Sequence, residues 1–302
     1  MGNRLLLYVH IPYCIHHCRF CDACVLVGSS EQKQRYLEAL TREIDSARDE
    51  LAEYSVAGIY VGGGSPTVMR PDSVALMVRR LKKLVNLERS AEVTIEVMPQ
   101  TVGTPLLTGL NPGGFTRYSL SVQSVIPQEL QAIDAGFTVQ DVQNAVLFLD
   151  RFRHNNVNLD LMYGIPEQTL RTWERTLHAV RDFNPGHVSV YPFKGNAAVE
   201  VGAADAADDT GAADDMIAFA SEYLPSLGLQ RYSTNHFAKP NRHSTYHQNR
   251  LNGMDYRGFG LGARSLVEGI AFENTLNLTT YLEHSADFET ITTNIIKLTN
   301  LQ

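Results

Sequence analysis

Residues 5–24 read LLLYVHIPYCIHHCRFCDAC, a short apolar run that leads directly into a cluster of cysteines. The run at 5–11 has the length and composition of a buried strand. All four cysteines of the chain lie in the segment that follows it. A disulfide framework would spread its cysteines along the chain to join distant segments. A cluster confined to one loop instead predicts a metal site in a reducing cytoplasm.

The spacing of the cysteines narrows the kind of metal site. Cys14, Cys18 and Cys21 are separated by three and by two residues, and Cys24 follows closely. A zinc site with Cys24 as fourth ligand is one interpretation, but structural zinc sites usually combine two separated ligand pairs. Three thiolates suit a [4Fe–4S] cluster that keeps one iron without a protein ligand. Because a fourth thiolate would close that iron, we expect Cys24 to be a bystander.

Beyond the cysteines, apolar runs alternate with amphipathic segments at the spacing of parallel β/α units. The predicted strands lie at 5–11, 58–62, 92–97, 116–122, 156–162 and 187–191. The predicted helices lie near 31–54, 72–87, 102–109, 127–151 and 169–183. Six units are too few for a closed eight-unit barrel, so the predicted fold is α/β, a partial (β/α)6 barrel. Its chemistry is expected at the carboxyl ends of the strands.

Composition and charge limit the domain organisation and the partners. We expect a barrel core at 1–200 and a short C-terminal extension at 201–302 that completes the barrel side and the active-site mouth. The acidic stretch EVGAADAADDTGAADD at 200–215 predicts a solvated loop that leads into a helix near 212–226. The net charge is −7, and no apolar run approaches the length of a membrane span. These features predict a cytoplasmic protein without a nucleic-acid or membrane partner.

Further motifs follow the predicted strands in a fixed order. They are YVHIPYC at 8–14, GGGSPT at 62–67, EVMP at 96–99, SLSVQS at 119–124, NLDLMYGIP at 158–166, NHFAKP at 235–240 and a last segment at 255–265. This series resembles the oxygen-independent coproporphyrinogen III oxidase family of radical S-adenosylmethionine (SAM) enzymes. That family includes haem chaperones and the class C radical SAM methylases and cyclopropanases. The resemblance implies a cluster that cleaves SAM to a 5′-deoxyadenosyl radical, and an electron donor such as flavodoxin or ferredoxin.

The resemblance also implies roles for individual residues. Cys14, Cys18 and Cys21 would hold the cluster. The candidate catalytic residues are Tyr8, Phe20, Tyr163 and His247, and Tyr191 is a further candidate on the substrate side. The residues implied in SAM binding are Tyr8, Gly62, Gly63, Gly64, Ser65, Thr67, Glu96, Gln123 and Asp160. Glycines suit such a loop because the backbone must approach the ligand closely.

The sequence departs from the family at three places. The segment IDAGF at 133–137 lacks the arginine that contacts SAM, so Arg117 becomes a candidate for holding the SAM carboxylate, unless this loop serves a different substrate. The haem-chaperone branch carries a His-Asn-x-x-Tyr-Trp stretch, whereas residues 246–251 read YHQNRL, and a downstream histidine is Arg264. The C-terminal domain of the family is apparently absent, so the more open mouth could accept a large, exposed or carrier-bound substrate such as a peptide. A small-molecule substrate is the other expectation.

Together, the family core and the lost haem-branch residues favour the class C branch. The predicted reaction is C-methylation or cyclopropanation in a specialised biosynthetic pathway, with a second SAM molecule as the carbon source. Tyr8 and Phe20 would then shape the space between the two SAM molecules. A haem chaperone-like or coproporphyrinogen oxidase-like protein remains the alternative. The chemistry at the barrel mouth, and not the fold, decides between these functions.

Overall fold

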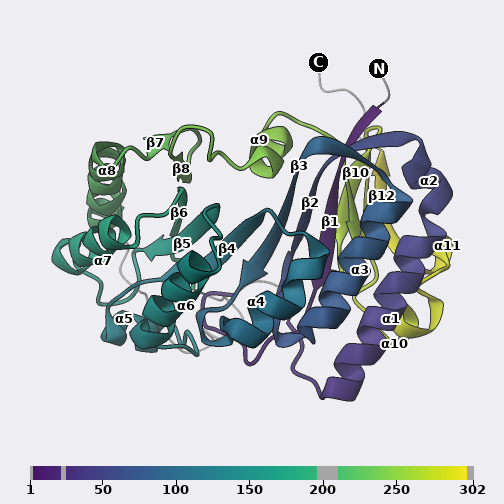
Figure 1. Ribbon diagram of the computed structural model, residues 1–302, viewed down its shortest axis with the longest axis horizontal. Coiled ribbons are helices and arrows are strands. Elements are labelled where there is room, and N and C mark those ends of the chain that lie inside the picture. Colours follow the sequence, from purple (N-terminus) through teal and green to yellow (C-terminus); the bar gives the residue numbers. More distant parts are fainter. Residues whose placement is uncertain (1–2, 22–24, 196–209, 298–302) are drawn as a thin grey trace.

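The structure, a computed structural model, describes residues 3–21, 25–195 and 210–297 (Figure 1). Its framework is one sheet, in which the described strands run in the order β12-β11-β10-β9-β1-β2-β3-β4-β5-β6-β8-β7. The six central strands are parallel, which confirms the predicted α/β partial barrel. They are β1 (Asn3–Ile11), β2 (Tyr54–Gly63), β3 (Asn86–Val97), β4 (Arg117–Gln123), β5 (Val157–Tyr163) and β6 (His187–Pro192).

Helices connect the central strands and cover one face of the sheet (Figure 1). They are α1 (Ser30–Ser46), α2 (Arg48–Ala52), α3 (Pro71–Leu84), α4 (Thr104–Leu110), α5 (Pro127–Ala132), α6 (Val139–Arg151) and α7 (Leu170–Phe183), with short 3-10 turns at η1 (Pro66–Val68), η2 (Pro99–Thr101) and η3 (Asn111–Gly113). Two predicted helices are divided. The predicted helix at 127–151 breaks because Asp134 and Gly136 have positive φ angles of 49° and 72°. A capping box at Thr138 then starts α6.

Alternate residues of the central strands face opposite sides of the sheet. In β1, Leu5, Leu7 and Val9 are fully buried in the core that the helices cover. Tyr8 and His10 belong to the other side, where their side chains bond each other. The same inner side carries an unusual number of polar groups, joined by hydrogen bonds and ion pairs: Tyr60, Glu92, Glu96, Arg117, Ser119, Asn158, Asp160, His187 and Ser189. The sheet therefore has one apolar face for stability and one polar face that lines the barrel.

The predicted extension at 201–302 adds strands to both edges of this sheet. β8 (His236–Ala238) pairs antiparallel with β6, and β9 (Tyr256–Phe259) pairs parallel with β1. The remaining elements are α8 (Thr210–Ser226), β7 (Gln230–Arg231), α9 (Thr245–Leu251), β10 (Arg264–Val267), β11 (Ile270–Asn274), α10 (Leu278–His284), α11 (Phe288–Ile291) and β12 (Thr292–Lys297). The division at residue 200 and the completion of the barrel side and active-site mouth by the extension remain predictions. Residues 200–209 of the acidic stretch lie outside the described residues.

α9 covers the amino-terminal ends of β1, β2 and β3 (Figure 1). Ser244 caps this helix, and its hydroxyl donates a hydrogen bond of 2.7 Å to Glu92 of β3. The backbone N–H of Thr245 donates to the other oxygen of the same carboxylate at 3.3 Å. A carboxylate at the first turn of a helix is stabilised by the free N–H groups there. The extension therefore closes the barrel at the end opposite the cysteine loop.

A buried carboxylate joins the extension to the first β/α unit. Glu43 of α1 accepts hydrogen bonds from the N–H of Gly260 at 2.8 Å, from Asn274 at 2.7 Å and from the hydroxyl of Tyr281 at 2.6 Å. The guanidinium of Arg257 lies 3.9 Å from it, and both side chains are almost fully buried. Burial raises the pKa of Glu43, and Arg257 and the three donors oppose that rise. None of the helices in the described part of the chain is long and apolar enough to cross a membrane.

Candidate functional site

The cysteine loop follows β1 at the carboxyl end of the sheet. Cys14 and Cys18 are buried and Cys21 is half-buried. Backbone hydrogen bonds fix the loop, because the N–H of Cys14 donates to Leu26 at 2.9 Å and the N–H of Ser65 donates to the carbonyl of Tyr13 at 2.8 Å. Burial, together with the nearby thiols of Cys14 and Cys21, raises the pKa of Cys18 to about 12. A positively charged metal centre is the partner that such a group of thiols requires before it can ionise.

The cysteine loop can be compared with the two predicted kinds of metal site, a mononuclear zinc site and a [4Fe–4S] cluster. Among residues 3–21, 25–195 and 210–297, no group of three or more His, Cys, Asp or Glu side chains stands close enough to hold a single metal ion. The thiolates of a [4Fe–4S] cluster bind different irons and stand farther apart than the ligands of one ion. Three cysteines on one loop match the predicted ligand set of a [4Fe–4S] cluster that leaves one iron without a protein ligand. Cys24, the predicted bystander, lies outside the described residues.

A carboxylate and a glycine loop lie beside the cysteine loop. Glu96, at the end of β3, accepts hydrogen bonds from the Tyr60 hydroxyl at 2.8 Å and from the N–H of Gly63 at 3.1 Å. A Cβ atom on Gly62 would stand 2.7 Å from the Glu96 carboxyl carbon, so the carboxylate occupies the space that this glycine leaves. Burial raises the pKa of Glu96 to about 7; the hydrogen bond from Tyr60 opposes the rise, and the charge of Asp160 adds to it.

The other residues implied in SAM binding are held by hydrogen bonds around this carboxylate. Asp160 of β5 accepts from Ser119 at 2.8 Å and from Asn158 at 2.8 Å. Gln123, the last residue of β4, is buried with a positive φ angle of 61°. Such a conformation is uncommon outside glycine and is often found at ligand sites. Ser65 and Thr67 are buried and their hydroxyl oxygens lie 3.2 Å apart, so they stabilise the glycine loop.

Two inward-facing residues of this region were not singled out from the sequence. The hydroxyl of Tyr8 lies 2.9 Å from Nδ1 of His10, and a Cβ atom on Gly63 would stand 2.7 Å from the His10 ring. Tyr60 is the second residue, through its hydrogen bond to Glu96. The signal was available, because His10 and Tyr60 share the two-residue alternation of Tyr8 and Gly62 and so face the same side.

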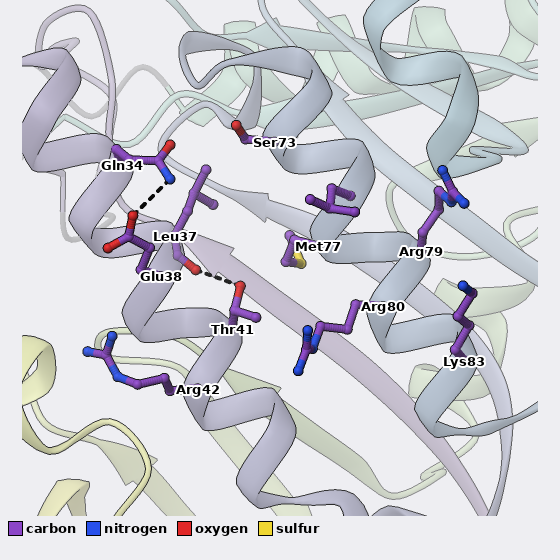
Figure 2. Close-up of a pocket in the computed structure, with 11 residues that line it drawn as sticks. Gln34, Leu37, Glu38, Thr41, Arg42, Ser73, Met77, Arg79, Arg80 and Lys83 are labelled. Atoms are coloured by element: carbon purple, nitrogen blue, oxygen red, sulfur yellow. Dashed lines mark hydrogen bonds between the residues drawn. The ribbon is translucent and has the colours of Figure 1, made fainter.

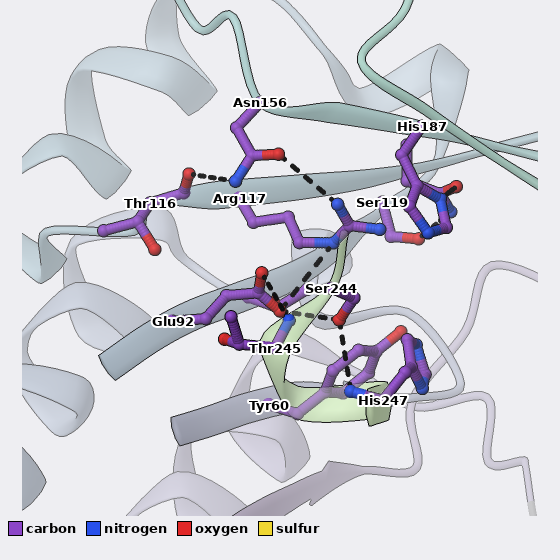
Figure 3. A network of polar contacts seen from close by, with 12 residues as sticks. Tyr60, Glu92, Thr116, Arg117, Ser119, Asn156, His187, Ser244, Thr245 and His247 are labelled. Atoms are coloured by element: carbon purple, nitrogen blue, oxygen red, sulfur yellow. Dashed lines mark hydrogen bonds and ion pairs between the residues drawn. The ribbon is translucent and has the colours of Figure 1, made fainter. Parts of the chain in front are cut away.

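Arg117 and His247 lie elsewhere in the barrel. Arg117 is the first residue of β4 and therefore stands at the amino-terminal end of the strand. Its guanidinium lies 3.9 Å from Glu92 and donates to the side chain of Asn156 at 3.3 Å (Figure 3). His247 belongs to α9, which covers the same end. The structure therefore does not bring either residue to the cysteine loop, and Arg117 already has an anionic partner.

Histidine side chains cluster at this amino-terminal end. The rings of His236 and His247 stack with centroids 4.8 Å apart, and His187 lies 5.5 Å from His236. Nδ1 of His187 bonds Asn158 at 2.6 Å, and its Nε2 lies 2.8 Å from the Tyr232 hydroxyl. Burial lowers the pKa of all three imidazoles, to about 4 for His236 and about 3 for His247, so they are neutral at pH 7.

The three remaining candidates for the substrate side are aromatic residues, Phe20, Tyr163 and Tyr191. Phe20 belongs to the cysteine loop and is half-buried against the main hydrophobic core. Tyr163, at the end of β5, packs on Trp173 with ring centroids 6.2 Å apart. Tyr191 of β6 makes an edge contact with His236 at 6.0 Å. Their roles on the substrate side remain predictions.

The large surface grooves of the described residues lie outside the barrel. One groove of about 580 Å³ runs between α1 and α3, where Arg42, Arg79, Arg80 and Lys83 line it (Figure 2). A second, of about 510 Å³, is formed by residues of α5, α6 and the loop between them. That loop contains residues 133–137, where the sequence departs from the family motif, and it contacts the cysteine loop through His16. Neither groove includes the polar interior described above.

The fit between Gly62 and Glu96 leads to a testable expectation. In Gly62→Ala, the added methyl group would displace the Glu96 carboxylate from its two donors. We expect SAM affinity to fall roughly tenfold, as for the loss of one charged hydrogen bond. Isothermal titration with SAM measures this fall. Gly103→Ala is the matched control because its nearest neighbour would be 3.8 Å away, and equal losses in both variants would contradict the expectation.

Comparison with known protein families identifies the family of this chain. The sequence description of the radical SAM superfamily matches residues 8–180, which span the cysteine loop and the first five strands. The chain belongs to the radical SAM superfamily. The superfamily implies a [4Fe–4S] cluster and SAM, together with an electron donor and a small-molecule substrate. The binding of a second SAM molecule remains a prediction. The cytoplasmic location also remains a prediction.

The chain is similar to two groups of curated proteins, the haem chaperones and the oxygen-independent coproporphyrinogen III oxidases. It is 28% identical over 267 residues to "Heme chaperone HemW" of Buchnera aphidicola subsp. Schizaphis graminum, covering 87% of this chain and 70% of that protein. It is 28% identical over 299 residues to the "Oxygen-independent coproporphyrinogen III oxidase" of Salmonella typhimurium, covering 92% of this chain but only 65% of the oxidase. The solved radical SAM structure of coproporphyrinogen III oxidase (HemN) from Escherichia coli superposes with a TM-score of 0.84 at 24% identity, over 98% of this chain and 73% of that one, which shows a shared fold.

These relatives correct the predicted reaction. C-methylation or cyclopropanation in a class C branch is wrong, because the matching curated proteins are haem chaperones and coproporphyrinogen oxidases. The family resemblance itself is confirmed at the level of the oxidase and chaperone group. The error arose because the cysteine loop and the SAM motifs belong to the common core, whereas the branch was inferred from residues that are missing.

Proposed function

We propose that this chain is a haem-binding radical SAM protein that resembles the haem chaperones. The observation that carries the proposal is the stacked pair His236 and His247 on the polar side of the sheet. An imidazole binds iron only in its neutral form. Burial lowers the pKa of both rings and keeps them neutral at pH 7, which is the form that binds iron. The named haem chaperones among the relatives support the same choice.

The cluster and SAM would bind at the other end of the barrel. A [4Fe–4S] cluster on Cys14, Cys18 and Cys21 supplies an electron that cleaves SAM. The chain's own residues would bind and orient SAM: Glu96 offers a carboxylate to its ammonium group, and Asp160 offers a second carboxylate held by Ser119. The glycine loop approaches closely because Gly62 and Gly63 carry no side chain.

A coproporphyrinogen oxidase is the weaker candidate. Its substrate carries carboxylate groups that require cations for recognition. Arg117, the large buried cation on the inner side, already lies beside Glu92 and bonds Asn156. Recruiting it for a substrate carboxylate would leave the Glu92 carboxylate buried without its partner, which is costly. This arrangement favours haem binding over porphyrinogen decarboxylation.

Titration of the purified protein with haemin tests the proposal. We expect a saturable shift of the Soret band at one haem per chain. His247→Ala should weaken haem binding roughly tenfold or more, since a lost metal ligand has at least the effect of a lost supporting contact. The matched control is His178→Ala, because His178 is exposed on α7.

Two results would contradict the haem-binding function. One is a wild-type protein that leaves the haemin spectrum unchanged. The other is conversion of coproporphyrinogen III, with SAM and a reductant present, by a protein that does not bind haem. In that case the oxidase candidate replaces the chaperone. Equal haem affinity of His247→Ala and the wild type would leave haem binding in place but exclude His247 as a ligand.

A further inference from the structure

Tyr60 of β2 has a buried side chain with an unusual set of neighbours. Its hydroxyl donates a hydrogen bond of 2.8 Å to one oxygen of Glu96, and the N–H of Gly63 donates to the other oxygen at 3.1 Å. Each oxygen of the carboxylate therefore has one fixed donor. A carboxylate held at both oxygens has one orientation, and each oxygen keeps a further lone pair that can accept a hydrogen bond.

The Tyr60 ring is itself held in place from two sides. Its ring centroid lies 6.2 Å from that of Tyr8 of β1 and 5.1 Å from that of Tyr246 of α9. The ring of His247, also from α9, lies 5.5 Å away (Figure 3). Burial and the charge of Glu96 raise the pKa of Tyr60 well above its ordinary value. The hydroxyl therefore stays protonated at neutral pH and donates to Glu96. Through this ring, α9 at the amino-terminal end contacts a group at the carboxyl end.

We propose that Tyr60 is a positioning residue for SAM, whose hydroxyl fixes the Glu96 carboxylate while α9 fixes the ring. The proposal rests on the contact between Glu96 and SAM put forward under the proposed function. It assigns α9 a role beyond closing the barrel, because Tyr246 and His247 determine where the Tyr60 hydroxyl lies. Tyr60 acts through Glu96 and does not itself touch the reacting atoms.

The proposal has a definite consequence for the pH dependence of SAM binding. The charged and titratable groups that face Glu96 are Asp160 of β5, which raises its pKa, and the neutral hydroxyls of Tyr8, Tyr60 and Tyr191. The ammonium group of SAM is attracted to the ionised carboxylate, so binding is strong above the pKa of about 7 and weakens as the pH falls through it. Removing a hydrogen bond to the charged form raises the pKa further.

The variant Tyr60→Phe tests this consequence. SAM affinity is measured by isothermal titration on the cluster-reconstituted protein without reductant, from about pH 6 to about pH 9. We expect the midpoint of the pH profile to move up by about one unit, so SAM binds roughly tenfold more weakly near the acid limit. We also expect weaker binding near the alkaline limit, because the ionised carboxylate loses the donor that fixes its orientation. Tyr118→Phe is the matched control, since Tyr118 is equally buried but lies in the core on the other face.

A second variant should shift the midpoint of the pH profile in the opposite direction. Replacement of Tyr60 by a fluorotyrosine, whose hydroxyl is a stronger donor of nearly the same size, should move the midpoint down. An unchanged midpoint in both variants would overturn the positioning role. The Glu96→Gln variant separates this failure from that of the underlying contact: if it binds SAM with the wild-type affinity and pH profile, then Glu96 does not bind SAM and the contact itself is excluded.

Discussion

The variant Cys18→Ala is expected to lose the visible absorption of the iron–sulfur cluster and all measurable binding of SAM. Cys18 is buried between the loop backbone and the carbonyl of Ala135, which lies 3.7 Å from its sulfur. Water cannot easily replace the thiolate there, so one iron would lose its ligand and the cluster would not assemble. The absorption spectrum and the iron content after anaerobic reconstitution measure the loss.

The control for this prediction is Cys24→Ala. It removes a thiol from the same cluster of cysteines, but the predicted bystander role implies that the cluster still forms. Iron content close to the wild type is therefore expected for Cys24→Ala. If Cys24→Ala lost the cluster and Cys18→Ala kept it, the assignment of the three ligands would be wrong, because the open iron would then have to be created by a different set of thiolates.

The second large effect is expected for Glu43→Ala, which should lower the free energy of unfolding by about 3–5 kcal/mol. The substitution removes the acceptor for Gly260, Asn274 and Tyr281 at once. It also removes one of the two carboxylates beside the buried guanidinium of Arg257, which keeps Glu50 at 3.4 Å. Unsatisfied buried donors and a weakened buried ion pair are among the costliest defects that one substitution can create. Urea denaturation followed by circular dichroism measures the change.

The matched control is Glu38→Ala, because Glu38 lies on the same helix but is exposed. Its loss should change the free energy of unfolding by less than about 0.5 kcal/mol. Glu43→Gln should fall between the two, since an amide keeps one acceptor for the donors but no charge for Arg257. A Glu43→Ala protein as stable as the Glu38→Ala protein would show that the buried network does not join the extension to the barrel.

The central strands could be predicted because each one combines an apolar face with strong local signals. The six predicted strands are all present, with ends that differ by a few residues. The break between α5 and α6 was missed because it depends on Asp134 adopting a left-handed conformation, which composition does not reveal. The strands that flank the parallel core were missed for another reason: β8 has three residues and β9 has four, and their partners in the core lie far away in the sequence.

Site residues that belong to sequence motifs could be predicted. Site residues whose position depends on tertiary packing could not. Glu96, Asp160 and the glycine loop were found from their order along the chain, and their contact with SAM stays a prediction. Arg117 was expected beside SAM although it begins a strand, and the amino-terminal start of a parallel strand lies at the wrong end of the barrel. Tyr60 has no motif of its own. Its importance depends on a hydrogen bond to a residue from a different strand.

The pairing of β1 with β9 has a consequence for how the protein is made. Leu6 is synthesised long before its partner Tyr256. Domains acquire structure during synthesis from the amino terminus onward. The six central strands can therefore assemble on their helices while the outer edges of β1 and β6 still lack partners, and unpaired edges favour aggregation. The nascent chain is expected to depend on chaperones until β8, α9 and β9 have emerged, and its polar interior stays open to small molecules for the same period.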